Sequence, residues 1–350
     1  MNGDPYGSRQ QIPVGPLCTL PGATMKQMIL QPRALQSIRK LRLSVTDRCN
    51  LRCRYCMAAD RPPTLDRSEL LSLEEMAHIA RVLCRHLPIQ SIKLTGGEPL
   101  VRHGLSDLVA ELAAIPGSPE ISMTTNGTLL RRFAADLKRN GLTRVNVSLD
   151  SLDAMRFADV TRGGNLAATL DGINAALENE LRPVKLNAVL RRSIWQQDVP
   201  QLLLFAGALG LEIRFIELMR TVTERVWCDS EFVSAAEIQT WLTRQGARIS
   251  LETHSTGSAC LSSVHGEGIS VRVGWITPRS HPFCASCDRI RMNARGHIFR
   301  CLMDGERIPI AELIRTTDET SALIATDQYL SSKKSPAAMV RADSMASIGG

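Results

Sequence analysis

The sequence predicts an α/β protein built on a parallel sheet. From Arg39 onward, short β-prone runs alternate with longer helical stretches, and six such strand-then-helix units can be counted. Repeated units of this kind form parallel sheets with right-handed crossovers. A closed barrel of eight units needs two more. An open, incomplete barrel and a doubly wound sheet therefore both fit the pattern.

The six strands are the β-prone runs of this repeat. They are expected at Arg39–Thr46, Ser91–Thr95, Ile121–Thr125, Arg144–Leu149, Lys185–Leu190 and Glu212–Glu217. Reactive residues lie at the carboxyl ends of the strands in barrels and in doubly wound sheets. Motifs that follow these strands are therefore the first candidates for chemistry.

Helices are expected between the strands, at Ser72–Leu87, Leu129–Asn140, Leu166–Glu180 and Val199–Leu209. Ser72 followed by Glu75 fits a capping box. Gly141 and Gly210 stand where helices are expected to stop. The longest apolar run, around residues 202–211, is far short of the ~20 residues that a membrane span needs, so it is interpreted as a buried helix.

The chain of 350 residues has room for a barrel and a smaller lobe. Residues 1–33 are rich in Gly, Pro and Gln and lack periodicity, so a disordered extension is expected there. Residues 34–245 carry the strand–helix repeat. The regularity fades after about Ser234, and residues 246–350 are expected to form a separate C-terminal lobe.

Composition favours a globular protein with an anionic ligand. Hydrophobic residues make up 44% and charged residues 22%, and the formal net charge is +7. A positive balance favours nucleotides, phosphates or nucleic acid. No block of consecutive Lys or Arg is present and aromatics are only 4%, so no nucleic-acid partner is expected. Without a secretory signal or an apolar span, no membrane association and a cytoplasmic location are expected.

The first cysteine motif directly follows the first expected strand. It reads Cys49-Asn-Leu-Arg-Cys53-Arg-Tyr-Cys56, a C-x3-C-x2-C spacing. Six of the ten cysteines fall in two tight groups, which favours metal ligands over disulfides. Three thiolates on a four-iron cluster leave one iron open. Zinc is the alternative, but nothing nearby completes four ligands.

This spacing, with an aromatic residue before the last cysteine, resembles the radical S-adenosylmethionine (SAM) superfamily. The resemblance implies that SAM chelates the open iron and that one electron splits it into methionine and a 5'-deoxyadenosyl radical. Gly96-Gly97-Glu98-Pro99 resembles the superfamily's GGE motif, where glycine lets the backbone approach the ligand. The implied SAM contacts are Tyr55, Gly97, Ser148 and Met219.

The second cysteine motif is Cys284-Ala-Ser-Cys287 followed by Cys301, a C-x2-C-x13-C spacing. Three thiolates again fit a 4Fe-4S cluster with an open iron. His281 stands three residues upstream, and with it as a fourth ligand a zinc site remains the alternative.

Both cysteine groups, together with the terminal Gly349-Gly350, resemble the GTP 3',8-cyclase family of molybdenum cofactor biosynthesis over residues 39–350. The resemblance implies an incomplete six-unit barrel of the TIM type, with a C-terminal lobe that closes its open side. It also implies two 4Fe-4S clusters, SAM and the substrate GTP. In that family the radical takes the ribose C3' hydrogen, and C3' then joins guanine C8, giving 3',8-cyclo-7,8-dihydro-GTP.

The resemblance also assigns substrate residues, since a triphosphate needs converging Arg and Lys side chains. The positions that match GTP contacts are Arg42, Lys93, Thr124, Lys185, Arg289 and Arg291. Arg214 is a charge in an otherwise apolar strand and needs a partner, which a phosphate would supply. Arg289, Arg291 and the Gly349-Gly350 tail are the implied catalytic residues. Lys93 stands where many relatives carry Arg, which keeps the charge but loses a bidentate contact.

The family further implies a homodimer, an electron donor such as a flavodoxin or ferredoxin, and handover of the product to cyclic pyranopterin monophosphate synthase. Two other functions compete. One is a different radical SAM enzyme with an auxiliary cluster, of the peptide-modifying type, which the phosphate-suited basic residues and the Gly-Gly end oppose. The other is a zinc-stabilised binding module, which would ignore SAM.

Overall fold

The computed structural model describes residues 35–60, 64–220, 225–252, 258–266, 268–284, 287–303 and 306–331. The expected N-terminal extension, residues 1–33, and the Gly349-Gly350 tail lie outside these ranges. Within them the strands form one eleven-stranded sheet, in the order β11-β10-β1-β2-β3-β4-β5-β6-β9-β8-β7.

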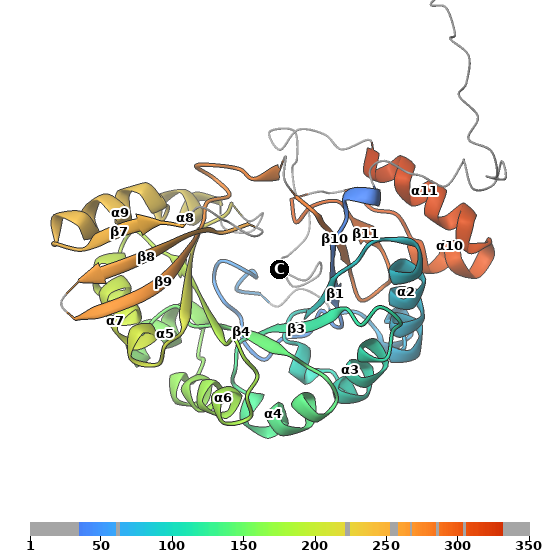
Figure 1. The fold of residues 1–350 in the computed structure, drawn as a ribbon, viewed down its shortest axis with the longest axis horizontal. Coiled ribbons are helices and arrows are strands. Elements are labelled where there is room, and N and C mark those ends of the chain that lie inside the picture. The colour runs from blue at the N-terminus through green and yellow to red at the C-terminus, as the bar shows by residue number, and fades with distance from the viewer. Residues whose placement is uncertain are drawn as a thin grey trace, which may run out of the picture. The chain divides into compact units, whose positions relative to one another are not determined.

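Six parallel strands form the centre of this sheet (Figure 1). They are β1 (Lys40–Ser44), β2 (Ser91–Thr95), β3 (Glu120–Thr125), β4 (Arg144–Ser148), β5 (Lys185–Leu190) and β6 (Glu212–Glu217). Each pairs in parallel with the next along the chain. A doubly wound sheet reverses its strand order at a switch point. The uninterrupted order therefore excludes that alternative and confirms the incomplete barrel.

Helices cover the outer side of these strands (Figure 1). They are α2 (Leu73–His86), α3 (Leu105–Ala113), α4 (Leu130–Arg139), α5 (Ala154–Thr161), α6 (Leu166–Glu178) and α7 (Trp195–Ala208). Three short 3-10 helices are η1 (Leu35–Ser37), η2 (Arg67–Glu69) and η3 (Pro99–Val101). The expected capping box of Ser72 and Glu75 is present. Gly141 and Gly210 end α4 and α7 with positive φ, as expected of helix stops.

The C-terminal region is more regular than its sequence indicates. After α8 (Arg225–Ser230) and α9 (Ala235–Arg244), the antiparallel strands β7 (Arg248–Leu251), β8 (Cys260–Gly266) and β9 (Ile269–Ile276) extend the sheet beyond β6. The strands β10 (Arg289–Met292) and β11 (Ile298–Phe299) extend it beyond β1, and α10 (Ile310–Thr316) and α11 (Glu319–Ser331) follow. Residues after 246 thus add strands to both edges of the sheet. None of the described helices is long and apolar enough to cross a membrane.

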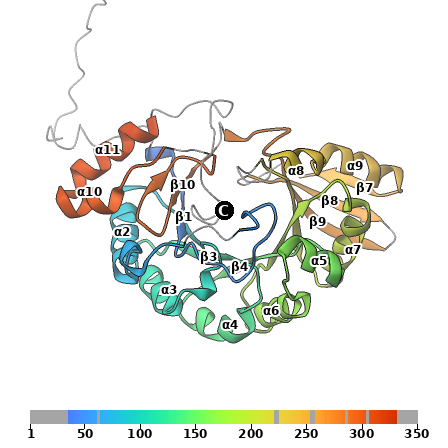
Figure 2. The same cartoon turned by 180° about the vertical axis from the view of Figure 1, so that it is seen from behind.

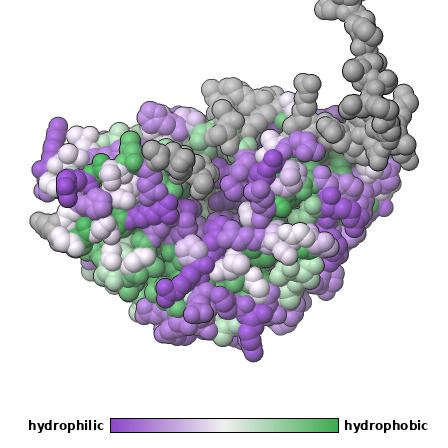
Figure 3. All heavy atoms as spheres, viewed as in Figure 1, coloured by the Kyte–Doolittle hydropathy of each residue, from purple (hydrophilic) through white to green (hydrophobic). Residues whose placement is uncertain are grey.

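The two faces of the sheet differ in polarity. Apolar side chains such as Leu41, Leu43 and Val145 are fully buried and pack into the core with the helices. The alternate positions, which face inward, carry polar residues such as Arg42 and Asn146. A filled barrel interior consists of branched apolar side chains. The inner face is therefore not a hydrophobic core, and hydrophilic residues lie along the middle of the molecular face in Figure 3.

Candidate functional site

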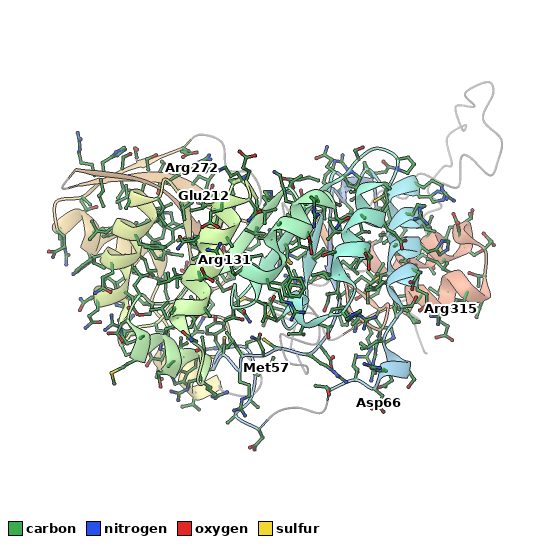
Figure 4. All side chains as sticks on the ribbon, turned by 90° about the horizontal axis from the view of Figure 1, so that it is seen from below. Met57, Asp66, Arg131, Glu212, Arg272 and Arg315 are labelled. Atoms are coloured by element: carbon green, nitrogen blue, oxygen red, sulfur yellow. The ribbon has the colours of Figure 1, made fainter. Side chains whose placement is uncertain are left out.

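The first cysteine group lies on the loop that follows β1, on the inner side of the sheet, where Figure 2 shows it in blue. The backbone N–H groups of Cys56 and Met57 both donate to the Cys53 carbonyl, at 2.9 and 3.0 Å, which closes a tight turn. In Figure 4, Met57 lies at the opposite end of the strands from Glu212, the first residue of β6. The loop is therefore at the carboxyl ends of the strands, as expected.

The thiols of this loop fit a multi-iron cluster. Burial raises the pKa of the Cys53 thiol, and the negative charges of Asp150, Cys56 and Cys49 raise it further. Thiolates this close need a bound cation to stay ionised together. Within the described ranges, no three His, Cys, Asp or Glu side chains are grouped to hold a single metal ion. Thiolates of an iron–sulfur cluster bind different irons, so they need not converge on one point.

The glycines of the GGE motif pack against the chain that leads into this loop. A Cβ on Gly97 would lie 2.3 Å from the Arg48 carbonyl oxygen, and one on Gly96 would lie 2.6 Å from that of Thr46. The Gly97 N–H donates to Thr46 O at 2.8 Å. Glycine is therefore required here by backbone contacts within the protein, independently of any ligand.

Glu98, the acid of the GGE motif, joins two strand ends beside the cysteine loop. It is 1% exposed. Its carboxylate accepts from Leu100 N at 3.1 Å, from Thr125 Oγ1 at 2.7 Å and from Asn126 N at 2.7 Å. The side-chain Nδ2 of Asn126 in turn donates to Asn50 Oδ1 at 2.9 Å. Glu98 thus ties the end of β3 to the residue next to Cys49, and burial raises the pKa of Glu98 to about 7.

The four implied SAM contacts surround the carboxyl ends of the strands. The Tyr55 hydroxyl donates to Asp150 Oδ2 at 2.8 Å, and Asp150 Oδ1 accepts from the N–H of Val189 on β5 at 2.8 Å. Ser148 is the last residue of β4, and Met219 follows β6 and is half-buried. The role of Asp150, which anchors the cysteine loop through Tyr55, is not apparent from the motif alone.

The second cysteine group lies at the other end of β1. Cys287 comes two residues before Arg289, which pairs with Lys40, the first residue of β1. In the antiparallel β10–β11 ladder Arg291 pairs with Phe299, and Cys301 follows two residues after Phe299. The Cys287 N–H donates to the Cys284 carbonyl at 3.3 Å, so the backbones of these two cysteines are in contact.

A buried carboxylate anchors the segment that leads to this second group. Glu217, at the end of β6, is 0% exposed. It accepts from Ala235 N at 3.1 Å, Arg279 N at 3.2 Å, Ser280 N at 3.0 Å and Ser280 Oγ at 2.6 Å. The chain before Cys284 is therefore held by a carboxylate that sequence reasoning missed, because its partners lie 18 to 63 residues away.

Between the two cysteine groups, the implied phosphate-binding cations share the inner face. Arg291, Arg42 and Lys93 occupy paired positions on β10, β1 and β2. Burial lowers the pKa of Arg42, and the charges of Arg291, Arg289 and Arg214 lower it further. Burial lowers the pKa of Lys93 as well, with Arg42, Arg144, Arg214 and Lys185 adding to the effect. This mutual repulsion is relieved by a multiply charged anion.

Arg214 has a partner within the protein. Its Nε donates to Glu212 Oε1 at 2.7 Å, and Lys185 Nζ donates to Glu212 Oε2 at 2.8 Å. Glu212 is 8% exposed, and Arg272 Nη1 lies 3.7 Å from Glu212 Oε2, so three cations share this nearly buried carboxylate. Glu212 is thus a partner for the Arg214 charge within the protein, and the proposed contact of Arg214 with phosphate stays a prediction. Glu212 precedes Arg214 by two residues, so strand alternation alone places both on one face.

The same inner face carries buried polar atoms without a hydrogen-bond partner among the described residues. They are Thr95 Oγ1, Ser122 Oγ, Thr124 Oγ1, Asn146 Oδ1 and Asn187 Oδ1. Buried polar atoms are nearly always paired in folded proteins. Their concentration on one face therefore indicates a polar ligand.

Comparisons with known proteins agree with this geometry. The profile of the Radical SAM superfamily matches residues 43–206, and that of Molybdenum Cofactor Synthesis C matches residues 211–339. The GTP 3',8-cyclase of Pelotomaculum thermopropionicum is 40% identical over 298 residues, which covers 84% of this chain and 91% of the relative. The chain belongs to the GTP 3',8-cyclase family.

Other members of the GTP 3',8-cyclase family match as well. The enzyme of Moorella thermoacetica is 44% identical over 280 residues, which covers 79% of this chain and 85% of the relative. GTP 3',8-cyclase 1 of Pseudomonas aeruginosa is 41% identical over 275 residues, covering 79% and 83%.

Solved structures confirm the radical SAM fold. Streptococcus suis SuiB bound to S-adenosylmethionine superposes with a TM-score of 0.57 at 15% identity, covering 82% of this chain and 66% of SuiB. SuiB bound to the precursor peptide SuiA gives a TM-score of 0.58 at 13% identity, covering 86% and 70%. At this identity the likeness extends to the fold alone.

Proposed function

We propose that the protein is a GTP 3',8-cyclase that forms 3',8-cyclo-7,8-dihydro-GTP in the first step of molybdenum cofactor biosynthesis. The observation that carries the proposal is the cluster of cations on the inner face between two groups of three cysteines. The strand β1 spans about 13 Å between these groups, at ~3.3 Å per residue. The cations on and beside this strand would hold the charges of a nucleoside triphosphate.

The phosphates are held by the side chains that repel one another in the free protein. Arg42, Lys93 and Arg291 present three cations in register, and Arg289 stands next to them on β10. The side chains of Lys185 and Arg214 are oriented by their hydrogen bonds to the Glu212 carboxylate. Charged hydrogen bonds to phosphate are about twice as strong as neutral ones, and Thr124 adds a hydroxyl to this set.

The first cluster is held by Cys49, Cys53 and Cys56, and the second by Cys284, Cys287 and Cys301. SAM bound at the first cluster would supply the radical chemistry needed at the ribose C3' position. The protein's contribution is placement: Gly96 and Gly97 fix the chain before Cys49, and Asp150 fixes Tyr55. Restricting the nucleotide in this way is the kind of preorganisation that lowers the entropic barrier of a reaction.

Several further features belong to the same proposal. The chain divides at residue 245 into a barrel part and a part that carries the second cluster, and Gly349 and Gly350, which lie outside the described residues, take part in catalysis. The protein acts in the cytoplasm as a homodimer, receives its electron from a flavodoxin or ferredoxin, and passes its product to cyclic pyranopterin monophosphate synthase. These points rest on membership of the family.

The test uses anaerobically reconstituted protein with SAM and dithionite, and mass spectrometry of 5'-deoxyadenosine and nucleotides with and without GTP. GTP-stimulated SAM cleavage and an isomer of GTP are expected. Cys53→Ala should abolish SAM cleavage, whereas Cys287→Ala should leave some cleavage and little product. If the wild type cleaves SAM but returns GTP unchanged, the substrate belongs to another radical SAM class, such as peptides.

A further inference from the structure

Two asparagine side chains on the inner face hold buried oxygens without a partner among the described residues. Asn146 on β4 is 2% exposed, and its Oδ1 accepts no hydrogen bond from any residue that the structure describes. The Oδ1 of Asn187 on β5 is in the same state. A buried polar group left unpaired costs about 1–3 kcal/mol. Two neighbouring positions of the fold are therefore destabilised by an unpaired oxygen, and a bound ligand that donates a hydrogen bond would remove this destabilisation.

The register of the sheet places Asn146 among the residues proposed for GTP. Its partner on β3 is Thr124, whose hydroxyl is also buried and unpaired in the described structure. Its partner on β5 is Lys185. Neighbouring residues in register lie about 5 Å apart, so one small polar group can reach Asn146 and these neighbours together.

Asn187 lies where the two proposed ligands meet. It pairs with Ser148 on β4, a proposed SAM contact, and with Arg214 on β6, a proposed GTP contact. Arg214 pairs with Gly274 on β9. A Cβ at Gly274 would lie 3.1 Å from Arg214 Cγ, so the glycine leaves space for the Arg214 side chain. The reacting ribose carbon must reach this meeting point if SAM is to supply the radical.

The chemistry of these side chains selects the ligand group. An asparagine amide donates through nitrogen and accepts through oxygen. A fully ionised phosphate offers only acceptors, and cations already surround it. A ribose hydroxyl both donates and accepts. We infer that Asn146 and Asn187 form a subsite for the ribose hydroxyls of the nucleotide substrate, which makes the enzyme prefer a ribonucleotide to its deoxy analogue. This inference rests on the proposed function.

SAM also carries a ribose, and its hydroxyls share this chemistry. The substrate is favoured because three of the four residues in register with the two asparagines are proposed GTP contacts, namely Thr124, Lys185 and Arg214. Only Ser148 belongs to the SAM side. The experiment therefore measures both ligands.

The test is a double-mutant cycle in which one change removes a hydroxyl from the ligand and the other removes an asparagine amide from the protein. Binding affinity is measured by calorimetry on the reconstituted enzyme without reductant. GTP, 2'-deoxy-GTP, 3'-deoxy-GTP and SAM are titrated separately into the wild type, Asn146→Ala and Asn187→Ala. Removing the recognised hydroxyl should lower wild-type affinity about tenfold, since a partner left unpaired is costly, and should have little effect in the variants. Coupling of this kind identifies a direct contact. Asn140→Ala, at the half-exposed C-cap of α4, should keep the wild-type discrimination.

Equal loss of affinity for GTP and both deoxy analogues in the variants would mean a structural role and would overturn the inference. So would a fall in SAM affinity with unchanged discrimination between the nucleotides. Asn146→Ser and Asn187→Ser repeat the cycle if an alanine variant does not fold. Failure of the proposed function is distinct, because it appears as wild-type protein that neither binds GTP nor converts it.

Discussion

The carboxylate of Glu98 accepts a hydrogen bond of 2.7 Å from the backbone N–H of Asn126, and the same carboxylate accepts from Thr125 Oγ1 and Leu100 N. All of these partners donate. In Glu98→Gln, the new NH2 group would face one or two of these donors. At pH 5, where Glu98 contributes most to the wild type, we expect the substitution to lower the free energy of unfolding by about 1–3 kcal/mol, measured by anaerobic urea denaturation. Glu111→Gln, on the exposed side of α3, is the control and should change it by less than about 0.5 kcal/mol.

The same carboxylate makes stability depend on pH. Burial raises the pKa of Glu98 from 4.5 to about 7, so the folded state binds the proton more tightly than the unfolded state. The contribution of Glu98 is therefore most favourable below pH 4.5 and is lost as pH rises through about 7. Between pH 5 and pH 8, the wild type should lose more stability than Glu98→Gln. Parallel pH profiles for the two proteins would contradict this assignment.

Gly97→Ala tests whether the GGE turn supports the cysteine loop. The added Cβ would lie 2.3 Å from Arg48 O and 2.6 Å from Arg48 C, and neither backbone atom can rotate away. The chain before Cys49 must shift, so we expect the variant to lose iron and sulfide from the first cluster while the second is retained. Gly266→Ala, whose Cβ would meet only Ala247 at 3.6 Å, should keep the wild-type iron content. Wild-type iron in Gly97→Ala would rule out this support.

The central fold could be predicted from sequence because each barrel strand is a short β-prone run between turn signals. The expected bounds of Ser91–Thr95, Lys185–Leu190 and Glu212–Glu217 are those observed. The strand β10 was missed because Arg289–Met292 has only four residues, two of them charged, which is too short for a periodic pattern.

The site was predictable to the extent that it lies in motifs. Cysteine spacing places both groups, but a contact between strands depends on register. The bond of Glu98 to Asn126 spans 28 residues, and no local pattern encodes it. The pairing of Glu212 with Arg214 is different, because both stand on one strand two residues apart and could have been recognised from alternation.

Lys93 should contribute substantially to nucleotide affinity. Its ammonium lies among Arg42, Arg144 and Arg214, where a triphosphate replaces repulsion by attraction. We expect Lys93→Met to weaken GTP binding at least about tenfold, equivalent to ~1.4 kcal/mol, and Lys93→Arg to retain it, since the charge is kept. Lys138→Met is the control, because Lys138 Nζ donates to Glu180 O on the exposed surface. Unchanged affinity in Lys93→Met would place the phosphates elsewhere.

Binding of GTP should also take up protons. In the free protein, burial and neighbouring cations lower the pKa of Lys93 well below 10.5, and burial lowers that of Lys185. A bound triphosphate raises both pKa values, because it favours the charged ammonium. Affinity should therefore fall as pH rises between the free and bound pKa values. Calorimetry in two buffers of different ionisation enthalpy measures the uptake. Lys93→Arg should show a smaller uptake because arginine stays charged, and equal uptake in both proteins would exclude Lys93 as the group that titrates.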